Sequence, residues 1–206
     1  KGYLTRATSA SLQTLGAAGS FLCRFETNEV GRAQIIFRSA GRAYLVFAST
    51  NYLAVTIAGA AATSPIVTLS ANTWYDVLVT WAYPGSLYVT ICPVGGSDTT
   101  GTKASVSGAA WDGTNYIGSY AGSTEFFNGS LRDVMLLSRV ITPEEWTAYK
   151  AGTKPTGSVV ADWPLYPDWL DDSGNANTLT AGGIAPTFNP KAAPTPKPAP
   201  TPKAVP

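Results

Sequence analysis

Short apolar runs follow one another along the first third of the chain. Four runs, at residues 21–25, 33–37, 43–47 and 53–57, are rich in β-branched and aromatic residues and recur about every ten residues. Runs of this length and spacing predict the strands of a β-sandwich or barrel. Helical periodicity is confined to residues 144–150. The pattern therefore predicts an all-β fold with one short helix.

The helix start carries its own signals. Thr142 suits the N-cap, Pro143 the first helical position, and Glu145 the third position of a capping box. The helix should end near Gly152. An apolar strand across residues 131–140 precedes it.

Several motifs together resemble the laminin-G-like, concanavalin A-like jelly-roll domains. They are the Gly-x-Leu-x-Asp-Val strand with its Thr-Pro-Glu-Glu helix start (129–145), Asn-Thr-Trp-Tyr-Asp-Val-Leu-Val-Thr (72–80), Gly-Ser-Leu-Tyr-Val (85–89), Tyr-Ile-Gly (116–118), Asp-Trp-Pro-Leu (162–165) and Asp-Asp-Ser-Gly-Asn-Ala-Asn (171–177). The resemblance covers residues 3–188. It implies a jelly-roll β-sandwich, in which Asp133 matches the strand aspartate of the family.

The last two motifs usually open such domains, but here they lie near the C-terminal end. Either the sandwich is circularly arranged, with the Trp163 strand beside residues 3–5, or a second copy begins at residue 158 and is cut off. A remnant of about thirty residues would not bury a core of its own, and the termini of a domain often lie close together. We therefore expect one sandwich over residues 1–189, closed by residues 158–188.

Residues 190–206 form a proline-rich repeat. Alternating prolines favour polyproline II, with three residues per turn, so Lys191, Lys197 and Lys203 fall on one edge. The segment is either a semi-rigid linker or an arm that docks on a neighbouring subunit.

Charge is sparse in this chain. Of 206 residues 13% are charged, the formal net charge is +1, and the arginines are scattered over separate strands and turns. Nucleic-acid binding needs a basic patch, so we expect none and place these arginines on solvated faces of the sandwich. No apolar stretch reaches the length of a membrane span. The composition is typical of extracellular, cell-surface or virion-surface proteins.

The sequence argues against catalysis. It contains no histidine, which removes the usual triads and the usual general base near neutral pH. It also lacks the alternating Glu-x-Asp-x-Glu carboxylates that sugar-hydrolysing relatives of this fold use. We therefore expect a protein that is not an enzyme. The two cysteines, Cys23 and Cys92, either form one disulfide or remain free thiols.

Sugar binding would need exposed aromatic rings beside polar groups. One turn brings together an aromatic ring, a carboxylate and an amide, and three further aromatic residues lie near loops. These candidates are Trp111, Asp112 and Asn115, with Tyr83, Tyr120 and Trp169. Trp74, Trp81 and Trp163 fit core positions instead, and Trp146 fits an anchor of the helix.

No cofactor is required by these patterns, but calcium is a candidate. The loop at residues 168–177 offers hard oxygen ligands, namely Asp168, Asp171, Asp172 and Asn175. The alternative is a plain turn stabilised by its Asp and Asn side chains.

Two functions remain open. The first is a non-catalytic module that binds glycans in adhesion. The second is a structural subunit of a virion or extracellular assembly, such as a capsid decoration, tail-fibre or filament protein, whose arm contacts neighbouring subunits in an oligomer. The fold class alone does not choose between them.

Overall fold

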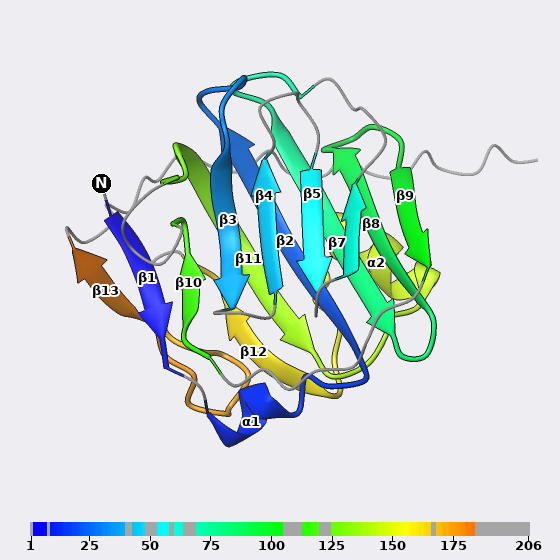
Figure 1. Cartoon of the computed structure of the whole chain (residues 1–206), viewed down its shortest axis with the longest axis vertical. Helices are drawn as coiled ribbons and strands as arrows, with labels where there is room; N and C mark the ends of the chain where they lie inside the picture. The colour runs from blue at the N-terminus through cyan, green and yellow to red at the C-terminus, as the bar shows by residue number, and fades with distance from the viewer. Residues whose placement is uncertain are drawn as a thin grey trace, which may run out of the picture.

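The computed structural model describes residues 2–7, 9–39, 43–47, 53–57, 60–63, 69–104, 113–119, 125–165 and 168–183. This part of the chain contains thirteen strands and two short helices. The strands form two antiparallel sheets that pack face to face (Figure 1). The predicted all-β, concanavalin A-like sandwich is thus confirmed, and the four early apolar runs lie in β2, β3, β4 and β5.

The front sheet has seven strands in the order β13-β1-β10-β3-β4-β5-β6. Their bounds are β1 Gly2–Arg6, β3 Gln34–Ser39, β4 Ala43–Phe47, β5 Leu53–Ile57, β6 Ala60–Thr63, β10 Asn115–Ile117 and β13 Thr180–Gly183. The back sheet has six strands in the order β12-β11-β2-β7-β8-β9. Their bounds are β2 Ala18–Thr27, β7 Trp74–Ala82, β8 Ser86–Pro93, β9 Thr99–Ala104, β11 Gly129–Leu137 and β12 Val159–Trp163.

The main core lies between the two sheets. Period-two alternation sends one set of side chains inward from each strand, so Leu87, Val89 and Ile91 of β8 are all fully buried. Trp81 and Trp163 belong to this core, as predicted. Trp74 is also buried, at 6% exposure. The guanidinium carbon of Arg132 lies 5.8 Å from the centroid of its ring.

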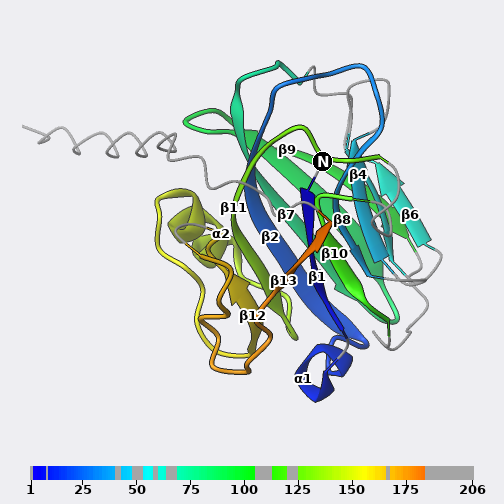
Figure 2. The same ribbon diagram turned by 90° about the vertical axis from the view of Figure 1, so that its left-hand side faces the viewer.

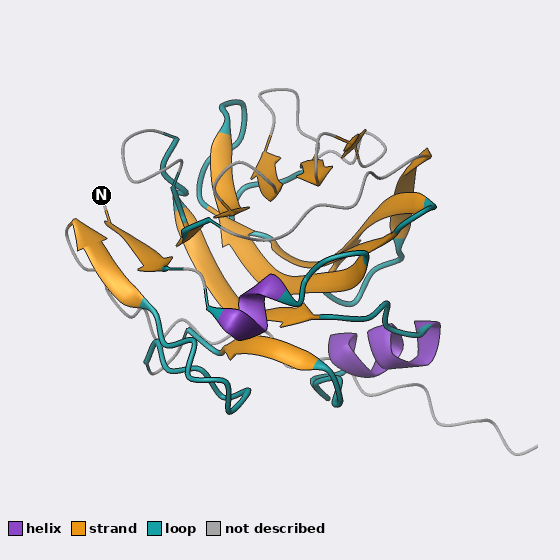
Figure 3. Ribbon diagram, turned by 60° about the horizontal axis from the view of Figure 1, so that its bottom comes forward, coloured by secondary structure: helices purple, strands orange, loops and turns teal. Residues whose placement is uncertain are grey.

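Helix α2 (Pro143–Lys150) covers the outer side of the back sheet (Figures 2 and 3). The predicted capping box is confirmed: the Glu145 amide donates to Thr142 Oγ1 at 3.2 Å, and the Thr142 amide donates to Glu145 Oε2 at 2.9 Å. Trp146 anchors the helix in a second apolar cluster with Leu22 and Met135. Its indole N–H donates to Asp98 Oδ2 at 2.9 Å.

Arg24 corrects the expectation that the arginines are solvated. Its side chain is 8% exposed and lies on the helix-covered side of the back sheet. Arg24 Nε donates to Asp76 Oδ1 at 2.7 Å, and Nη2 donates to the Lys150 carbonyl at 3.2 Å. A charge buried this deeply requires such partners, and here the partners fix the last turn of α2 to the sheet.

The C-terminal segment supplies one strand to each sheet. β12 pairs with β11, with Trp163 opposite Val134, while β13 pairs with β1. The prediction that the Trp163 strand lies beside residues 3–5 is therefore wrong. The Trp163 side chain fills the core, and its indole N–H donates to the Asn177 carbonyl at 2.8 Å. The chain crosses from β12 in the back sheet to β13, the neighbour of β1 in the front sheet, only after Trp163.

Both cysteines are free thiols. Cys23 faces the core between the sheets, whereas Cys92 faces α2 on the other side of the back sheet. Two side chains on opposite faces of one sheet cannot be bridged. Burial raises the pKa of Cys92 to about 11, so the thiol stays protonated near neutral pH.

Helix α1 (Ala10–Gln13) closes one end of the sandwich (Figure 1). Its Leu12 and the following Leu15 are fully buried. The Ser9 hydroxyl caps the helix start by accepting from the Leu12 amide at 3.3 Å. This end of the sandwich is also where β1 and β3 finish and β10 begins (Figure 1).

Candidate functional site

Three aromatic rings gather on the outer face of the front sheet. Leu4 of β1 and Ile117 of β10 point into the core, so alternation turns Tyr3 and Tyr116 outward. Phe126, from the segment before β11, joins them. The ring centroids of Tyr3 and Tyr116 lie 6.3 Å apart, and those of Tyr3 and Phe126 also lie 6.3 Å apart. We call these three residues the front aromatic cluster.

Gly182 of β13 sets the position of the Tyr3 ring. The two residues are directly opposite in the β1–β13 ladder. A Cβ atom at residue 182 would overlap the Tyr3 ring. The missing side chain therefore allows Tyr3 to lie flat over its neighbouring strand. All three rings of the cluster are partly exposed.

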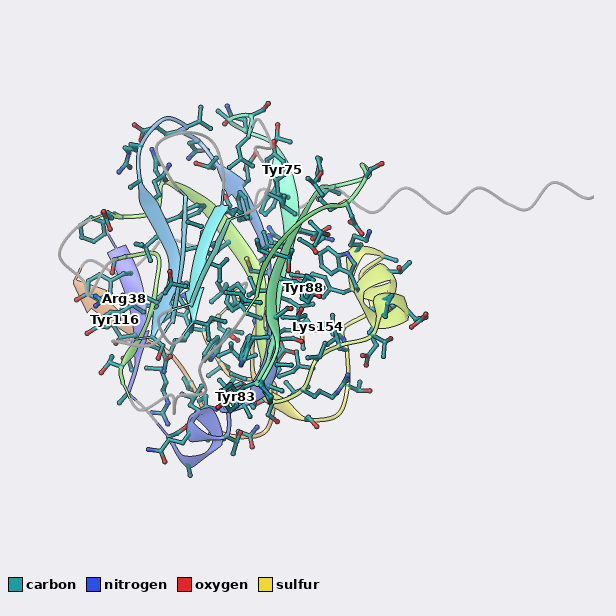
Figure 4. The ribbon with its side chains drawn as sticks, turned by 45° about the vertical axis from the view of Figure 1, so that its right-hand side comes forward. Arg38, Tyr75, Tyr83, Tyr88, Tyr116 and Lys154 are labelled. Carbon is teal, nitrogen blue, oxygen red and sulfur yellow. The ribbon has the colours of Figure 1, made fainter. Side chains whose placement is uncertain are left out.

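Polar side chains continue the same face. Register places Thr180, Thr5, Tyr116 and Arg38 in one row across four strands. The hydroxyl oxygens of Thr5 and Thr180 are 3.2 Å apart. Figure 4 shows Tyr116 and Arg38 close together on this part of the front sheet. Tilted rings beside hydroxyl and guanidinium groups form a surface suited to binding sugars by stacking and hydrogen bonds.

The sequence-based sugar candidates fall in different places. Trp111, Asp112 and Tyr120 lie outside the described residues. Asn115 is 1% exposed and points to the interior from β10, and Trp169 packs partly buried against the main core. Tyr83 is 54% exposed in the turn between β7 and β8, near α1 (Figure 4). The described three thus come from three separate segments.

The front aromatic cluster has no local sequence signal because it depends on strand order. In the sequence, Tyr116 belongs to a strand motif and Tyr3 to the first strand. Alternation along each strand gives the outward direction of both rings. Nothing in the local pattern shows that β1 and β10 are neighbours, since more than a hundred residues separate them.

Both carboxylate oxygens of the calcium candidate Asp171 accept hydrogen bonds from the protein. Asp171 Oδ1 accepts from the amides of Asp162 at 2.9 Å and Ser173 at 3.1 Å. Asp171 Oδ2 accepts from the Asn177 amide at 2.7 Å and the Ser173 hydroxyl at 2.8 Å. Four donors already surround this carboxylate. A calcium ion would have to displace N–H groups that are themselves buried.

The other candidate calcium ligands make separate contacts of their own. Asp168 caps the Leu170 amide at 3.0 Å, and the Asn175 side-chain amide donates to the Val160 carbonyl at 3.1 Å. Asp172 is exposed, and only its backbone amide bonds to the strand, to the Asp162 carbonyl at 2.8 Å. Within the described ranges, no group of three acidic, cysteine or histidine residues could hold a metal ion.

These bonds give the loop a structural role. β12 is an edge strand, and an edge exposes unpaired backbone groups that invite aggregation. The loop meets that edge with side chains: Asp171 takes the Asp162 amide, while Asn175 and Asn177 donate to the Val160 carbonyl. The motif at residues 171–177 therefore caps the edge of the back sheet.

Asp133 lies at an irregularity of β11. The register with β2 shifts between Arg132 and Met135, and Asp133 has a positive φ of 50°. Its carbonyl accepts from the Tyr149 hydroxyl at 3.0 Å, and its carboxylate lies 3.6 Å from Lys154 Nζ. Such a bulge re-aims the strand, and here it docks α2 through Tyr149.

Two further observations concern partners. The arm lysines Lys191, Lys197 and Lys203 lie outside the described residues. In the described part of the chain, no helix is both long and apolar enough to cross a membrane.

Comparison with known proteins agrees with this fold. A sequence profile of the concanavalin A-like lectin/glucanases superfamily matches residues 2–145. No curated protein sequence matches the chain. The chain therefore belongs to the concanavalin A-like lectin/glucanase superfamily.

Solved structures show the same architecture at low sequence identity. A candidate carbohydrate-binding protein from Bacteroides ovatus superposes with a TM-score of 0.65 and 17% identity, covering 89% of this chain and 56% of that one. A native heptameric SAP-like pentraxin from Limulus polyphemus superposes with a TM-score of 0.55 and 18% sequence identity, and the match covers 88% of each chain. The present chain thus spans little more than half of the Bacteroides protein.

Proposed function

We propose that the protein is a non-catalytic glycan-binding module that acts through the front aromatic cluster. The observation that carries this proposal is the partly exposed, tilted trio of Tyr3, Tyr116 and Phe126 on the outer face of the front sheet. Membership in a superfamily of lectins and glucanases supports it, as does the fold shared with a candidate carbohydrate-binding protein. The sequence lacks the alternating Glu-x-Asp-x-Glu carboxylates of sugar-hydrolysing relatives, which favours binding over hydrolysis.

The cluster provides two kinds of contact. Apolar C–H faces of a sugar ring pack on aromatic faces, and the hydroxyls bond to groups at the ring edges. Thr5 and Arg38 stand beside Tyr116 in the same cross-strand row. A strip of side chains that crosses several strands suits a run of sugar units.

Retention on immobilised glycans tests this function. Tyr116→Ala should weaken retention about tenfold, which corresponds to a loss of about 1.4 kcal/mol. Tyr88→Ala is the matched control, because Tyr88 is 45% exposed on the outer face of the other sheet. Equal retention of both variants, at unchanged melting temperature, would reject the front cluster. Failure of the wild-type chain to bind any glycan of a broad panel would reject the function.

The turn at residues 111–115 remains a proposed second contact. Trp111→Ala and the milder Asp112→Ala should lower retention without altering the melting curve. If Trp111→Ala unfolds the chain, the tryptophan is a core residue.

The assembly role is the alternative function. In that case the sandwich packs on neighbouring subunits of a virion or extracellular structure, and residues 190–206 reach across them. The mass in solution, measured with and without residues 190–206, separates the two functions. A monomer in both forms favours the binding module, whereas an oligomer that dissociates without the arm favours assembly.

A further inference from the structure

Asn128 is the only asparagine of the chain that precedes a glycine. Both Asn128 and Gly129 are exposed, and they lie where β11 begins. Glycine places no side chain beside the Asn128 amide, so the Gly129 nitrogen can approach the amide carbon without steric hindrance. The pair is therefore suited to a reaction in which a backbone nitrogen attacks the side-chain amide that precedes it.

Packing requires the glycine at residue 129. A Cβ atom there would overlap the Glu26 carbonyl and press on the Phe127 ring. A larger residue, which would shield the Asn128 amide, therefore does not fit this position. The fold thus keeps an exposed asparagine next to an unhindered backbone nitrogen.

The Gly129 N–H lies outside the ladder between β2 and β11. The Asn28 amide donates to the Asn128 carbonyl at 2.9 Å, so these two residues form a hydrogen-bonded pair. The next pair, Thr27 and Gly129, is then a non-hydrogen-bonded pair, because the two kinds alternate. Consistent with this, the Thr27 carbonyl accepts on its far side from the Asn72 amide at 2.7 Å. The Gly129 N–H therefore points away from β2, toward the side on which β12 pairs with β11 only from residue 134 onward.

The Asn128 side chain is held only by long hydrogen bonds at the surface. Its Nδ2 donates to Glu29 Oε2 at 3.2 Å, and its Oδ1 accepts from Asn28 Nδ2 at 3.5 Å. Bonds of this length are weak, and water competes for exposed groups. Gly129 is also the first residue of β11, and the ends of elements open most easily. The amide carbon and the attacking nitrogen can therefore meet without unfolding of the sandwich.

We propose that Asn128 is a modification site, which deamidates spontaneously in the folded protein. The Gly129 nitrogen loses its proton and bonds to Asn128 Cγ, and the side-chain nitrogen leaves as ammonia. Water then opens the resulting cyclic imide. Cleavage between the Gly129 nitrogen and Cγ gives aspartate, whereas cleavage between that nitrogen and the backbone carbonyl carbon of residue 128 gives isoaspartate. The net reaction consumes water and releases ammonia, and it does not depend on the proposed glycan binding.

Either product changes the contacts of this junction. Residue 128 gains a carboxylate that faces Glu29, where the Asn128 amide now donates at 3.2 Å. Like charges this close repel each other. Arg32 is the cation placed to bridge them, because its Nε donates to Glu29 Oε2 at 2.7 Å. Its Nη2 donates to the Phe126 carbonyl at 3.4 Å, and we expect Arg32 to exchange this longer bond for the new carboxylate.

Incubation of the full-length chain at mildly alkaline pH, in water enriched in heavy oxygen, tests the proposal. Asn28 is the matched control, since it is exposed at the same junction but precedes glutamate. Peptide mapping by mass spectrometry should find heavy oxygen at residue 128 accumulating at least about tenfold faster than at residue 28. A smaller difference, or no incorporation at residue 128, would mean that the fold protects Asn128 and would overturn the proposal.

Two variants at the exposed residue 128 test the mechanism and its consequence. Asn128→Gln keeps an amide but requires a larger, slower-forming ring, so it should incorporate little heavy oxygen in the same period. Asn128→Asp supplies one product from the start. The Arg32 Nε–H signal in NMR spectra should move in the same direction in Asn128→Asp and in the incubated wild-type chain, and should stay in place in incubated Asn128→Gln. Incorporation in Asn128→Gln as fast as in the wild type would refute the attack by Gly129, and an unmoved Arg32 signal in Asn128→Asp would refute the exchange of its partners.

Discussion

The edge-capping role of Asp171 gives a sharp prediction. Asp171→Ala removes four hydrogen bonds at once, and two of the stranded donors are the amides of Asp162 and the fully buried Asn177. Each buried donor left without a partner costs about 1–3 kcal/mol. Partial rescue by water leaves an expected loss of about 3 kcal/mol in the free energy of unfolding. For a chain of this size that lowers the melting temperature by about 6–12 °C.

The controls follow from the same loop. Asp172→Ala should change stability by less than about 0.5 kcal/mol, because the exposed Asp172 contributes only its backbone amide. Asp171→Asn keeps one acceptor oxygen and should lose about half as much as Asp171→Ala. Circular dichroism melts of the three variants and the wild-type chain measure these differences.

Calcium enters the same experiment as the competing explanation. If Asp171 acts only as an acceptor for protein donors, melts in excess EDTA and in millimolar calcium should coincide for the wild-type chain. If the loop binds calcium, the wild-type melting temperature should rise with calcium and Asp171→Ala should abolish that rise. A calcium-dependent melt, or an Asp171→Ala variant as stable as the wild type, would refute the edge-capping argument.

Three further predictions concern the C-terminal third. Deleting everything after Thr156 removes β12 and β13, so thermal melts should show no cooperative unfolding transition near the melting temperature of the full chain. The milder Trp163→Ala should lower the free energy of unfolding by about 3–5 kcal/mol. Hydrogen bonds from Arg139 and the Thr142 amide lower the pKa of Glu145 to about 2. That stabilisation is therefore complete above the ordinary value of about 4.3 and is lost as the pH falls toward 2, so the melting temperature of Glu145→Gln should approach that of the wild type in acid. Moving the three arm lysines by one position each, with every proline kept, should weaken assembly or surface attachment if the arm docks; unchanged attachment would leave it a linker.

Local sequence signals were sufficient to predict the early strands and helix α2. The capping box of Thr142 and Glu145 involves residues three apart, and the early strands alternate within a few residues. Trp146 was predictable as an anchor because a short helix must bury its large apolar side chain to be stable. The partner of its indole N–H, Asp98, lies 48 residues away and has no sequence signal.

The loop at residues 171–177 shows why composition alone does not identify a ligand site. Carboxylate and amide oxygens look alike in a sequence whether they surround a cation or accept from backbone amides. The choice depends on where the edge of β12 lies, and that edge exists only after β12 pairs with β11.

The front aromatic cluster depends on a non-local event, the placement of β10 between β1 and β3. This single step brings Tyr116 beside Tyr3 on the outer face and Asn115 between Arg6 and Ser39 on the inner face. Adjacent residues of one three-residue strand thus serve two surfaces. A shift of β10 by one residue would exchange the two faces, turning Tyr116 into the core and the Asn115 amide to solvent. The register of this strand therefore determines whether the front aromatic cluster forms at all.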